Sequence, residues 1–358
     1  METQVRGLAR RQAARGDDVC VITATPGPGD ARGRSTEQRD GVRIERVTAR
    51  LPADIPVHPR TSAHVRDLLR DQPVDVVHIH AGAISPFAWG ALGAATAMGL
   101  PVVVTVHSMW GPLARAGLGG GDRVLGWSAA GVVMTAVSGV AASAVAEALH
   151  CEVGVVPNGI DPEEWRSHDG HGLARPPGLR AVSVLRLAPR KRVGALLRAT
   201  ANAARTAGPE HPISLTVIGD GPERSRAERL ARRLGLDARF TGRLTKDEIR
   251  ERFADADVFV QASVRESFGI AALEARTFGL PVVARSQTGT GEFIENGVNG
   301  LLAPDDPGLS GALVALARDP GLIERMRRTN TGTLPRQTWD HVLEEAAGFY
   351  RRALSANT

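Results

Sequence analysis

Short apolar runs alternate with longer segments of helical character along most of the chain. The runs that predict strands lie at 18–24, 41–47, 74–80, 101–107 and 131–137 in the first half, and at 180–187, 213–219, 238–242, 257–262 and 281–284 in the second. Their Val and Ile positions are nearly continuous rather than alternating, which indicates strands covered on both faces. Strands that alternate with helices predict parallel, doubly wound α/β sheets.

The alternation is interrupted at 163–179, which is polar and rich in Gly, Pro and His, as a linker is. A chain of 358 residues is also too long for one hydrophobic core. We therefore expect a first domain over 1–162, a linker over 163–179 and a second domain over 180–335, followed by a helical segment at 336–358. The prediction is of two doubly wound α/β domains that face each other across a cleft.

The beginning of the first domain departs from this pattern. It opens on a helical segment that ends at Gly16, a residue typical of helix C-termini. A doubly wound domain normally opens with a strand that lies in mid-sheet and is followed by a glycine-rich turn. We expect that this first strand and its loop are missing because the true start lies upstream.

Composition excludes several classes of protein. Hydrophobic residues make up 42% of the chain and charged residues 23%, which is typical of a globular protein. Cys20 and Cys151 cannot form a disulfide framework, so a reducing compartment is expected. No apolar run reaches the roughly 20 residues of a membrane span, and no signal peptide is evident. The expected location is cytoplasmic.

The two halves of the chain differ in charge. Residues 1–170 carry 16 Lys and Arg against 18 Asp and Glu, whereas residues 171–358 carry 28 against 21. The basic second half is therefore the better candidate for binding a phosphate-bearing ligand. Nucleic acid is not the expected partner, because aromatic residues make up only 4% of the chain and no aromatic-studded basic segment stands out.

The segment SVRESFGIAALE at 263–274 carries the most informative pattern. A helix is predicted to begin around 268–270, so that an anion could bind the backbone N–H groups of Ser267, Phe268, Gly269 and Ile270. The segment resembles the retaining glycosyltransferases of family 4, which have the GT-B fold. The resemblance implies that Glu266 contacts hydroxyls of a donor sugar and that Glu274 holds the ribose of a nucleotide.

Other segments follow in family order along nearly the whole chain. In LRLAPRKR at 185–192, the resemblance implies that Arg186 and Lys191 bind the donor diphosphate. The backbone of Arg243 and Leu244, in FTGRL, would lie against the base, and His107, in TVHS, would lie near the anomeric carbon. Three more segments complete the pattern: VVPNGID at 155–161, GLPVVAR at 279–285 and GVNGLLAPDD at 297–306.

The resemblance implies a retaining, metal-independent transfer of a sugar from a nucleoside diphosphate sugar to a hydroxyl acceptor, without a cofactor. It also implies a C-terminal helix that crosses back onto the first domain. Two other functions remain open. One is a nucleotide-sugar epimerase, which would act on the donor alone. The other is a non-catalytic partner subunit of a glycosyltransferase.

Some sequence features have simpler structural interpretations. Asp255 and Asp257 match the D-x-D pattern of metal-dependent transferases, but they end a predicted helix and begin a strand, so no metal is expected. His78 and His80 share one face of a strand and lack a third ligand, which favours a structural or cleft-lining role. Segment 108–127 fits a mobile acceptor-side loop, a peripheral membrane contact for a lipid acceptor, or plain packing.

Overall fold

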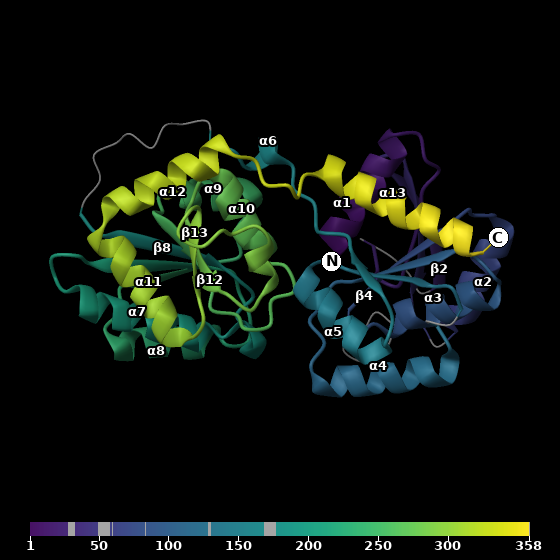
Figure 1. Cartoon of the computed structure of the whole chain (residues 1–358), viewed down its shortest axis with the longest axis horizontal. Coiled ribbons are helices and arrows are strands. Elements are labelled where there is room, and N and C mark those ends of the chain that lie inside the picture. The colour runs from purple at the N-terminus through teal and green to yellow at the C-terminus, as the bar shows by residue number, and fades with distance from the viewer. Residues whose placement is uncertain are drawn as a thin grey trace. The chain divides into compact units, whose positions relative to one another are not determined.

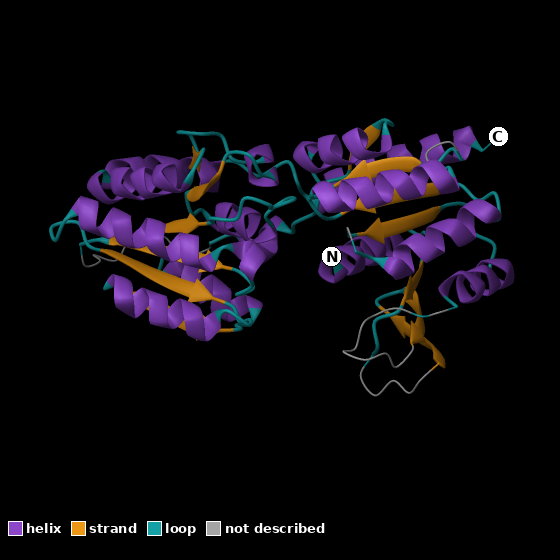
Figure 2. Ribbon diagram, turned by 90° about the horizontal axis from the view of Figure 1, so that it is seen from below, coloured by secondary structure: helices purple, strands orange, loops and turns teal. Residues whose placement is uncertain are grey.

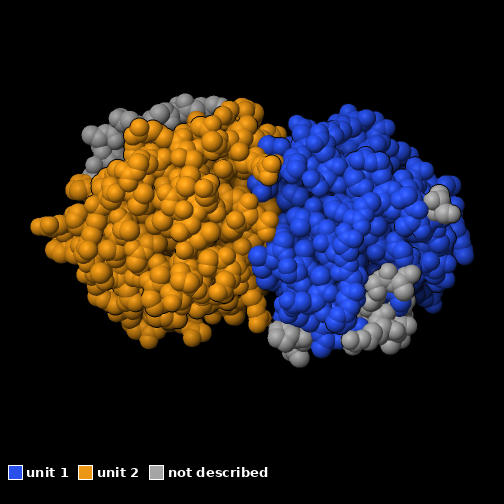
Figure 3. Space-filling model, in the orientation of Figure 1, with its two compact units in different colours: residues 1–159, 337–358 blue, residues 160–336 orange. Residues whose placement is uncertain are grey.

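The computed structural model describes residues 1–27, 33–48, 58, 60–82, 84–127, 130–167 and 177–357. Part of the predicted linker, 168–176, lies outside the described residues. The chain divides into two compact units (Figure 3). Unit 1 consists of residues 1–159 and 337–358, and unit 2 consists of residues 160–336.

Unit 2 is built on one six-stranded parallel sheet. Its strands are β8 (Leu179–Val184), β9 (Ile213–Ile218), β10 (Ala238–Gly242), β11 (Val258–Val260), β12 (Val282–Arg285) and β13 (Gly300–Ala303). Strands β8, β12 and β13 are labelled in Figure 1. The order of the six strands in the sheet is β10-β9-β8-β11-β12-β13, and every neighbouring pair is parallel. This is the order of a classic dinucleotide-binding sheet, in which the winding reverses between β8 and β11.

Helices lie on both faces of this sheet (Figure 2). They are α7 (Val193–Ala207), α8 (Arg224–Leu234), α9 (Lys246–Ala254), α10 (Ile270–Phe278), α11 (Asp306–Arg318) and α12 (Pro320–Gly332), with the shorter α6 (Pro162–Trp165), η2 (Pro189–Lys191) and η3 (Gly289–Glu292). All three residues of β11 are fully buried, which explains its uninterrupted apolar sequence. The fold class predicted from the continuous Val and Ile runs is confirmed here.

Unit 1 contains a four-stranded parallel sheet in the order β4-β5-β6-β7. Its strands are β4 (Val77–Ala81), β5 (Val102–Val106), β6 (Val133–Ala136) and β7 (Val153–Val155). The helices α2 (Thr61–Asp71), α3 (Pro86–Ala97), α4 (Pro112–Leu125) and α5 (Gly139–Leu149) connect or flank them. All five residues of β5 are buried, so the sheet is covered on both faces at this strand.

A smaller sheet in the same unit has the order β1-β3-β2. It consists of β1 (Cys20–Thr23), β2 (Gly33–Arg39) and β3 (Val42–Thr48), with β2 antiparallel to β3. The predicted strand at 41–47 corresponds to β3, whereas β2 is absent from the predicted strands. The turn that joins them carries a hairpin signal: Asp40 and Gly41 have φ of 54° and 77°, as a type I′ turn requires. Among the described residues, β1 pairs with β3 alone and β4 with β5 alone.

The chain returns to unit 1 through its last helix, α13 (Trp339–Ala356), which packs on α1 (Glu2–Ala14). A small core joins them, and the Trp339 ring lies against two glycines. A Cβ atom on Gly7 or Gly159 would come within 2.3 or 2.4 Å of that ring, so only glycine fits at these two positions. None of the helices in the described ranges has the length and apolarity that crossing a bilayer would need.

Candidate functional site

Helix α10 begins with an open N-terminus at the carboxyl edge of the unit 2 sheet. Gly269 is its N-cap residue and has a φ of +93°, a left-handed conformation that favours glycine. As a glycine, it has no side chain with which to cap the helix. The first N–H groups of a helix have no partner within the helix, and together with the helix dipole they form a site suited to an anion. The predicted start of this helix, around 268–270, agrees with its first residue, Ile270.

The switch point between β8 and β11 brings two predicted site residues together. Lys191 follows β8 in the turn η2, and Glu266 follows β11 in the loop before α10. Lys191 Nζ donates to Glu266 Oε2 at 2.5 Å, and 22% and 14% of the two side chains are exposed. Ligands of open α/β sheets bind at this type of switch point. The pair therefore places a cation and a carboxylate where a ligand is expected.

The loops around this pair are tightly held. The guanidinium of Arg192 donates to both oxygens of Asp306, at 2.9 and 2.8 Å, and Arg285 donates to the same carboxylate at 3.0 Å. On the other side, Gly289 N donates to Glu266 O at 3.0 Å, and a Cβ on Gly289 would lie 2.2 Å from the Ser267 carbonyl oxygen. Both partners of the Lys191–Glu266 pair thus sit on fixed backbone.

Phe268, another predicted site residue, is buried. It is 1% exposed, and its ring packs 5.5 Å from that of Phe293, so its side chain anchors the loop while its backbone remains the part suited to an anion. Arg186 is exposed, and its side chain makes no hydrogen bond or ion pair in the part of the chain that the structure describes. It lies just after β8, on the edge where Lys191 lies. An exposed cation without a protein partner is available to a charged ligand.

Arg243 and Leu244 lie between β10 and α9, at the same edge of the sheet. Gly219 N donates to Gly242 O at 2.7 Å, which ties the turn after β9 to the residue before Arg243. The parallel sheet therefore gathers the loops after β8, β10 and β11 at one edge, as the family resemblance requires. No side-chain contact among the described residues joins Arg243 to the Lys191–Glu266 pair.

Glu274 lies on α10, four residues after its first residue. Burial raises the pKa of its carboxyl to about 8; Lys246 opposes this rise and Glu164 adds to it. Lys246 forms an ion pair with Glu164, and its Nζ lies 5.3 Å from the centre of the Trp165 ring. The sequence indicated Glu274 but not this surrounding group, because α6 and α9 are brought to α10 only by the fold.

In unit 1, His107 follows β5 and belongs to a cluster of three histidines. His80 Nδ1 lies 2.9 Å from His107 Nε2, and the His78 and His80 ring centroids are 4.1 Å apart. Burial lowers the pKa of all three imidazoles, that of His80 to about 4, so the rings are neutral at pH 7. The shared face of His78 and His80 was predicted from their spacing. Their proximity to His107 could not be predicted from spacing, because it depends on the register in which β4 pairs with β5.

The D-x-D aspartates have structural roles. Asp255 ends α9, and Asp257 accepts hydrogen bonds from Arg180 Nε and Nη2 at 2.8 and 2.7 Å. Arg327 also reaches the Asp257 carboxylate, at 3.5 Å. Within the described residues, no group of three or more His, Cys, Asp or Glu side chains is placed to hold a metal ion.

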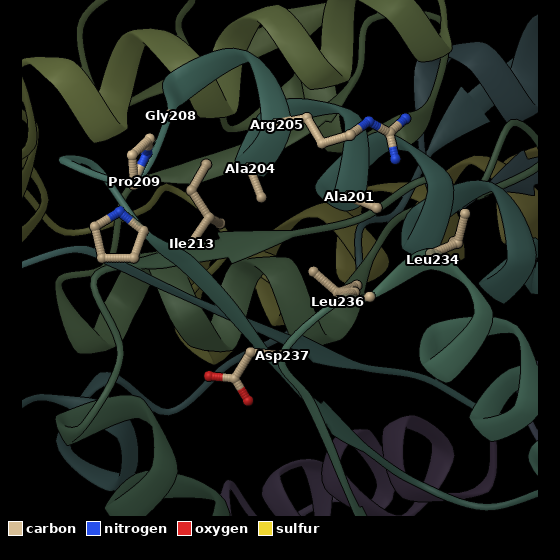
Figure 4. Close-up of a pocket in the computed structure, with 11 residues that line it drawn as sticks. Ala201, Ala204, Arg205, Gly208, Pro209, Ile213, Leu234, Leu236 and Asp237 are labelled. Carbon is tan, nitrogen blue, oxygen red and sulfur yellow. The ribbon is translucent and has the colours of Figure 1, made fainter.

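A cavity of about 370 Å³ lies elsewhere in unit 2 (Figure 4). It is lined by the end of α7 and by residues at the starts of β9 and β10, including Arg205, Pro209, Ile213 and Asp237. These residues lie at the amino edge of the sheet, opposite to the edge that carries Lys191 and Glu266. We therefore do not assign the site to this cavity.

The sequence matches two family models in succession. Residues 1–164 match the model described as Glycosyltransferase Family 4, and residues 173–331 match Glycosyl transferases group 1. A D-inositol 3-phosphate glycosyltransferase of Acidothermus cellulolyticus is 31% identical over 99% of this chain and 86% of its own length. The chain belongs to the family 4 glycosyltransferases.

A further relative agrees with this assignment, and solved structures show the fold. A D-inositol 3-phosphate glycosyltransferase of Kribbella flavida is 29% identical over 99% of this chain and 90% of its own length. Sucrose-phosphate synthase from Thermosynechococcus elongatus has a TM-score of 0.73 and 19% identity, covering 98% of this chain and 93% of that one. Anabaena HepE, solved with UDP and glucose, has a TM-score of 0.68 and 19% identity, covering 86% of both chains. This family 4 glycosyltransferase thus has the GT-B fold.

Proposed function

We propose that this glycosyltransferase moves a sugar from a nucleoside diphosphate sugar to a hydroxyl group of an acceptor, with retention of anomeric configuration and without a metal ion. The observation that carries the proposal is the Lys191–Glu266 pair at the switch point of unit 2, beside the N-terminus of α10, whose N-cap residue is Gly269. Such a site offers a cation and helix N-terminal N–H groups to a diphosphate and a carboxylate to sugar hydroxyls.

The donor would lie along the carboxyl edge of the unit 2 sheet. Its diphosphate would contact Arg186, Lys191 and the N–H groups at the start of α10. Glu266 would accept hydrogen bonds from the sugar hydroxyls and Glu274 from the ribose. The backbone at Arg243 and Leu244 would lie against the base. These assignments combine the placement of each residue with its match to the family pattern.

Retention follows from an attack on the face from which the diphosphate leaves. The bond between the anomeric carbon and the phosphate oxygen breaks, and its electron pair goes to that oxygen. The acceptor hydroxyl oxygen then bonds to the anomeric carbon, and its proton passes to the departing phosphate. Lys191, Arg186 and the α10 N–H groups stabilise the developing charge. His107 would contact the sugar or the acceptor near the anomeric carbon.

The acceptor class is inferred from the relatives. Because two relatives that span 99% of this chain carry the name D-inositol 3-phosphate glycosyltransferase, we infer a polyol hydroxyl as the acceptor and inositol 3-phosphate as the first compound to test. UDP is the first nucleotide to test, because HepE was solved with UDP and glucose.

A reaction with and without acceptor separates the candidate functions. The purified chain is incubated with UDP-glucose or UDP-N-acetylglucosamine, alone and with inositol 3-phosphate, and the products are identified by proton NMR. We expect release of UDP that depends on acceptor, and a product with the α configuration of the donor. A β-linked product would contradict retention. Conversion of the donor to an epimer without acceptor would identify an epimerase instead.

A further inference from the structure

The ring nitrogens of the histidine cluster are almost all hydrogen-bonded. His78 Nδ1 lies 2.8 Å from the Tyr350 hydroxyl, and His78 Nε2 lies 2.7 Å from Thr105 Oγ1. His107 Nε2 hydrogen-bonds His80, and the His107 ring also hydrogen-bonds the side chain of Asn158. His80 Nδ1 is bonded to His107, whereas His80 Nε2 has no hydrogen bond to any described residue.

The unpaired nitrogen lies at the edge of the sheet where ligands bind. His80 is the fourth of the five residues of β4, next to its carboxyl end, and it pairs in register with Thr105 of β5. Its side chain is only partly buried. The carboxyl edge of a parallel sheet is where substrates of open α/β folds bind, and His107 lies at the same edge.

His80 can bond a hydroxyl through Nε2 in either tautomer of its neutral ring. The 2.9 Å contact between His80 Nδ1 and His107 Nε2 has its proton on one of these two nitrogens. His80 Nε2 is an acceptor when Nδ1 carries that proton, and an N–H donor when His107 Nε2 carries it. A hydroxyl both donates and accepts, so it matches either form.

We propose that His80 Nε2 forms a hydrogen bond with a substrate hydroxyl, so that His80 contacts the substrate beside His107. The inference rests on the transferase function proposed above. A neutral imidazole nitrogen suits an uncharged hydroxyl, which both donates and accepts, whereas a phosphate oxygen is bound more strongly by a charged donor. The hydroxyl belongs either to the donor sugar or to the acceptor alcohol, and the two sources are separated by the test below.

Two amide substitutions separate contact with the substrate from support of His107. In His80→Asn, the amide oxygen or nitrogen can replace Nδ1 and keep the bond to His107, but nothing replaces Nε2. In His80→Gln, the amide oxygen or nitrogen can replace Nε2 and bond the hydroxyl, but the bond to His107 is lost. We expect His80→Asn to lower kcat/KM for transfer by about 10- to 100-fold, and His80→Gln to stay within about fivefold of the wild type.

Tyr350→Phe serves as the matched control. It removes one hydroxyl, bonded to His78 and to Gln12, without touching His80, so kcat/KM should stay near that of the wild type. Thermal unfolding of each variant and its affinity for UDP show that both units remain folded.

Hydrolysis of the donor in the absence of acceptor identifies the hydroxyl. If hydrolysis falls with transfer in His80→Asn, the contact is to the donor sugar. If hydrolysis is unchanged and KM for the acceptor rises, the contact is to the acceptor. His80→Asn with the activity of the wild type would overturn the proposal, and so would His80→Gln no more active than His80→Asn. A wild-type chain that neither binds UDP nor transfers sugar would instead refute the proposed function. The proposed contact of His80 with the substrate would then be refuted as well.

Discussion

Replacing Lys191 with alanine is expected to lower kcat/KM for sugar transfer by about 30- to 900-fold. One preorganised charge contact with a leaving group is worth about 2–4 kcal/mol of transition-state stabilisation. Lys191 is held for this role, because its Nζ is 2.5 Å from Glu266 and the next residue is fixed by Asp306. Steady-state kinetics with varied donor measure the effect.

Arg190→Ala is the matched control for this substitution. Arg190 lies in the same turn, is exposed and has no hydrogen bond or ion pair within the described ranges. Its removal takes the same charge from the loop, so an effect of general electrostatics would appear in both variants. The role of Lys191 would be refuted if its alanine variant kept the kcat/KM of the wild type, or if Arg190→Ala lost as much.

Replacing Glu274 with glutamine is expected to change how stability depends on pH. The pKa of this carboxyl is raised to about 8 in the folded chain, above the ordinary value of 4.5. The folded state therefore holds the proton more tightly than the unfolded state. The stability that this proton provides is complete below pH 4.5 and is lost as the pH rises to about 8, by at most roughly 1.4 kcal/mol per pH unit.

Glutamine is neutral at every pH, so Glu274→Gln removes this loss. The melting temperature of the variant should be similar to that of the wild type at pH 5 and higher at pH 8, with a difference that grows steadily between them. Glu251→Gln, an exposed glutamate on α9, is the control and should show no such trend. A constant difference across the range would mean that Glu274 does not hold a proton in the folded chain.

The parallel sheets could be predicted from sequence because their strands are buried on both faces. Continuous Val and Ile runs such as 101–107 then leave little ambiguity, and β5 is buried at every position. Strand β2 was missed because its sequence, GRSTEQR, is polar, although Asp40 and Gly41 form a hairpin turn between it and the predicted strand β3. Polar strands carry no hydrophobic pattern from which to predict them.

Some residues of the site could be predicted from the sequence, whereas most of the contacts between them could not. Lys191 and Glu266 were found by their spacing and family pattern, and the fold explains them by placing β8 beside β11. Contacts that depend on register or on distant helices could not be predicted. His80 meets His107 only because β4 pairs with β5, and Glu164 approaches Glu274 only because α6 packs on α10. The missing first strand stays a prediction.

Thermal unfolding of the purified chain with UDP, GDP, ADP and dTDP in separate samples tests the central claim most directly. A ligand at 100 times its Kd adds about 2.7 kcal/mol to stability, which corresponds to a rise of several degrees for a domain of this size. A nucleoside diphosphate site in unit 2 predicts that one of the four nucleotides, with UDP first in expectation, raises the melting temperature and that Lys191→Ala weakens the rise. A chain that unfolds cooperatively and responds to none of them would contradict the donor site.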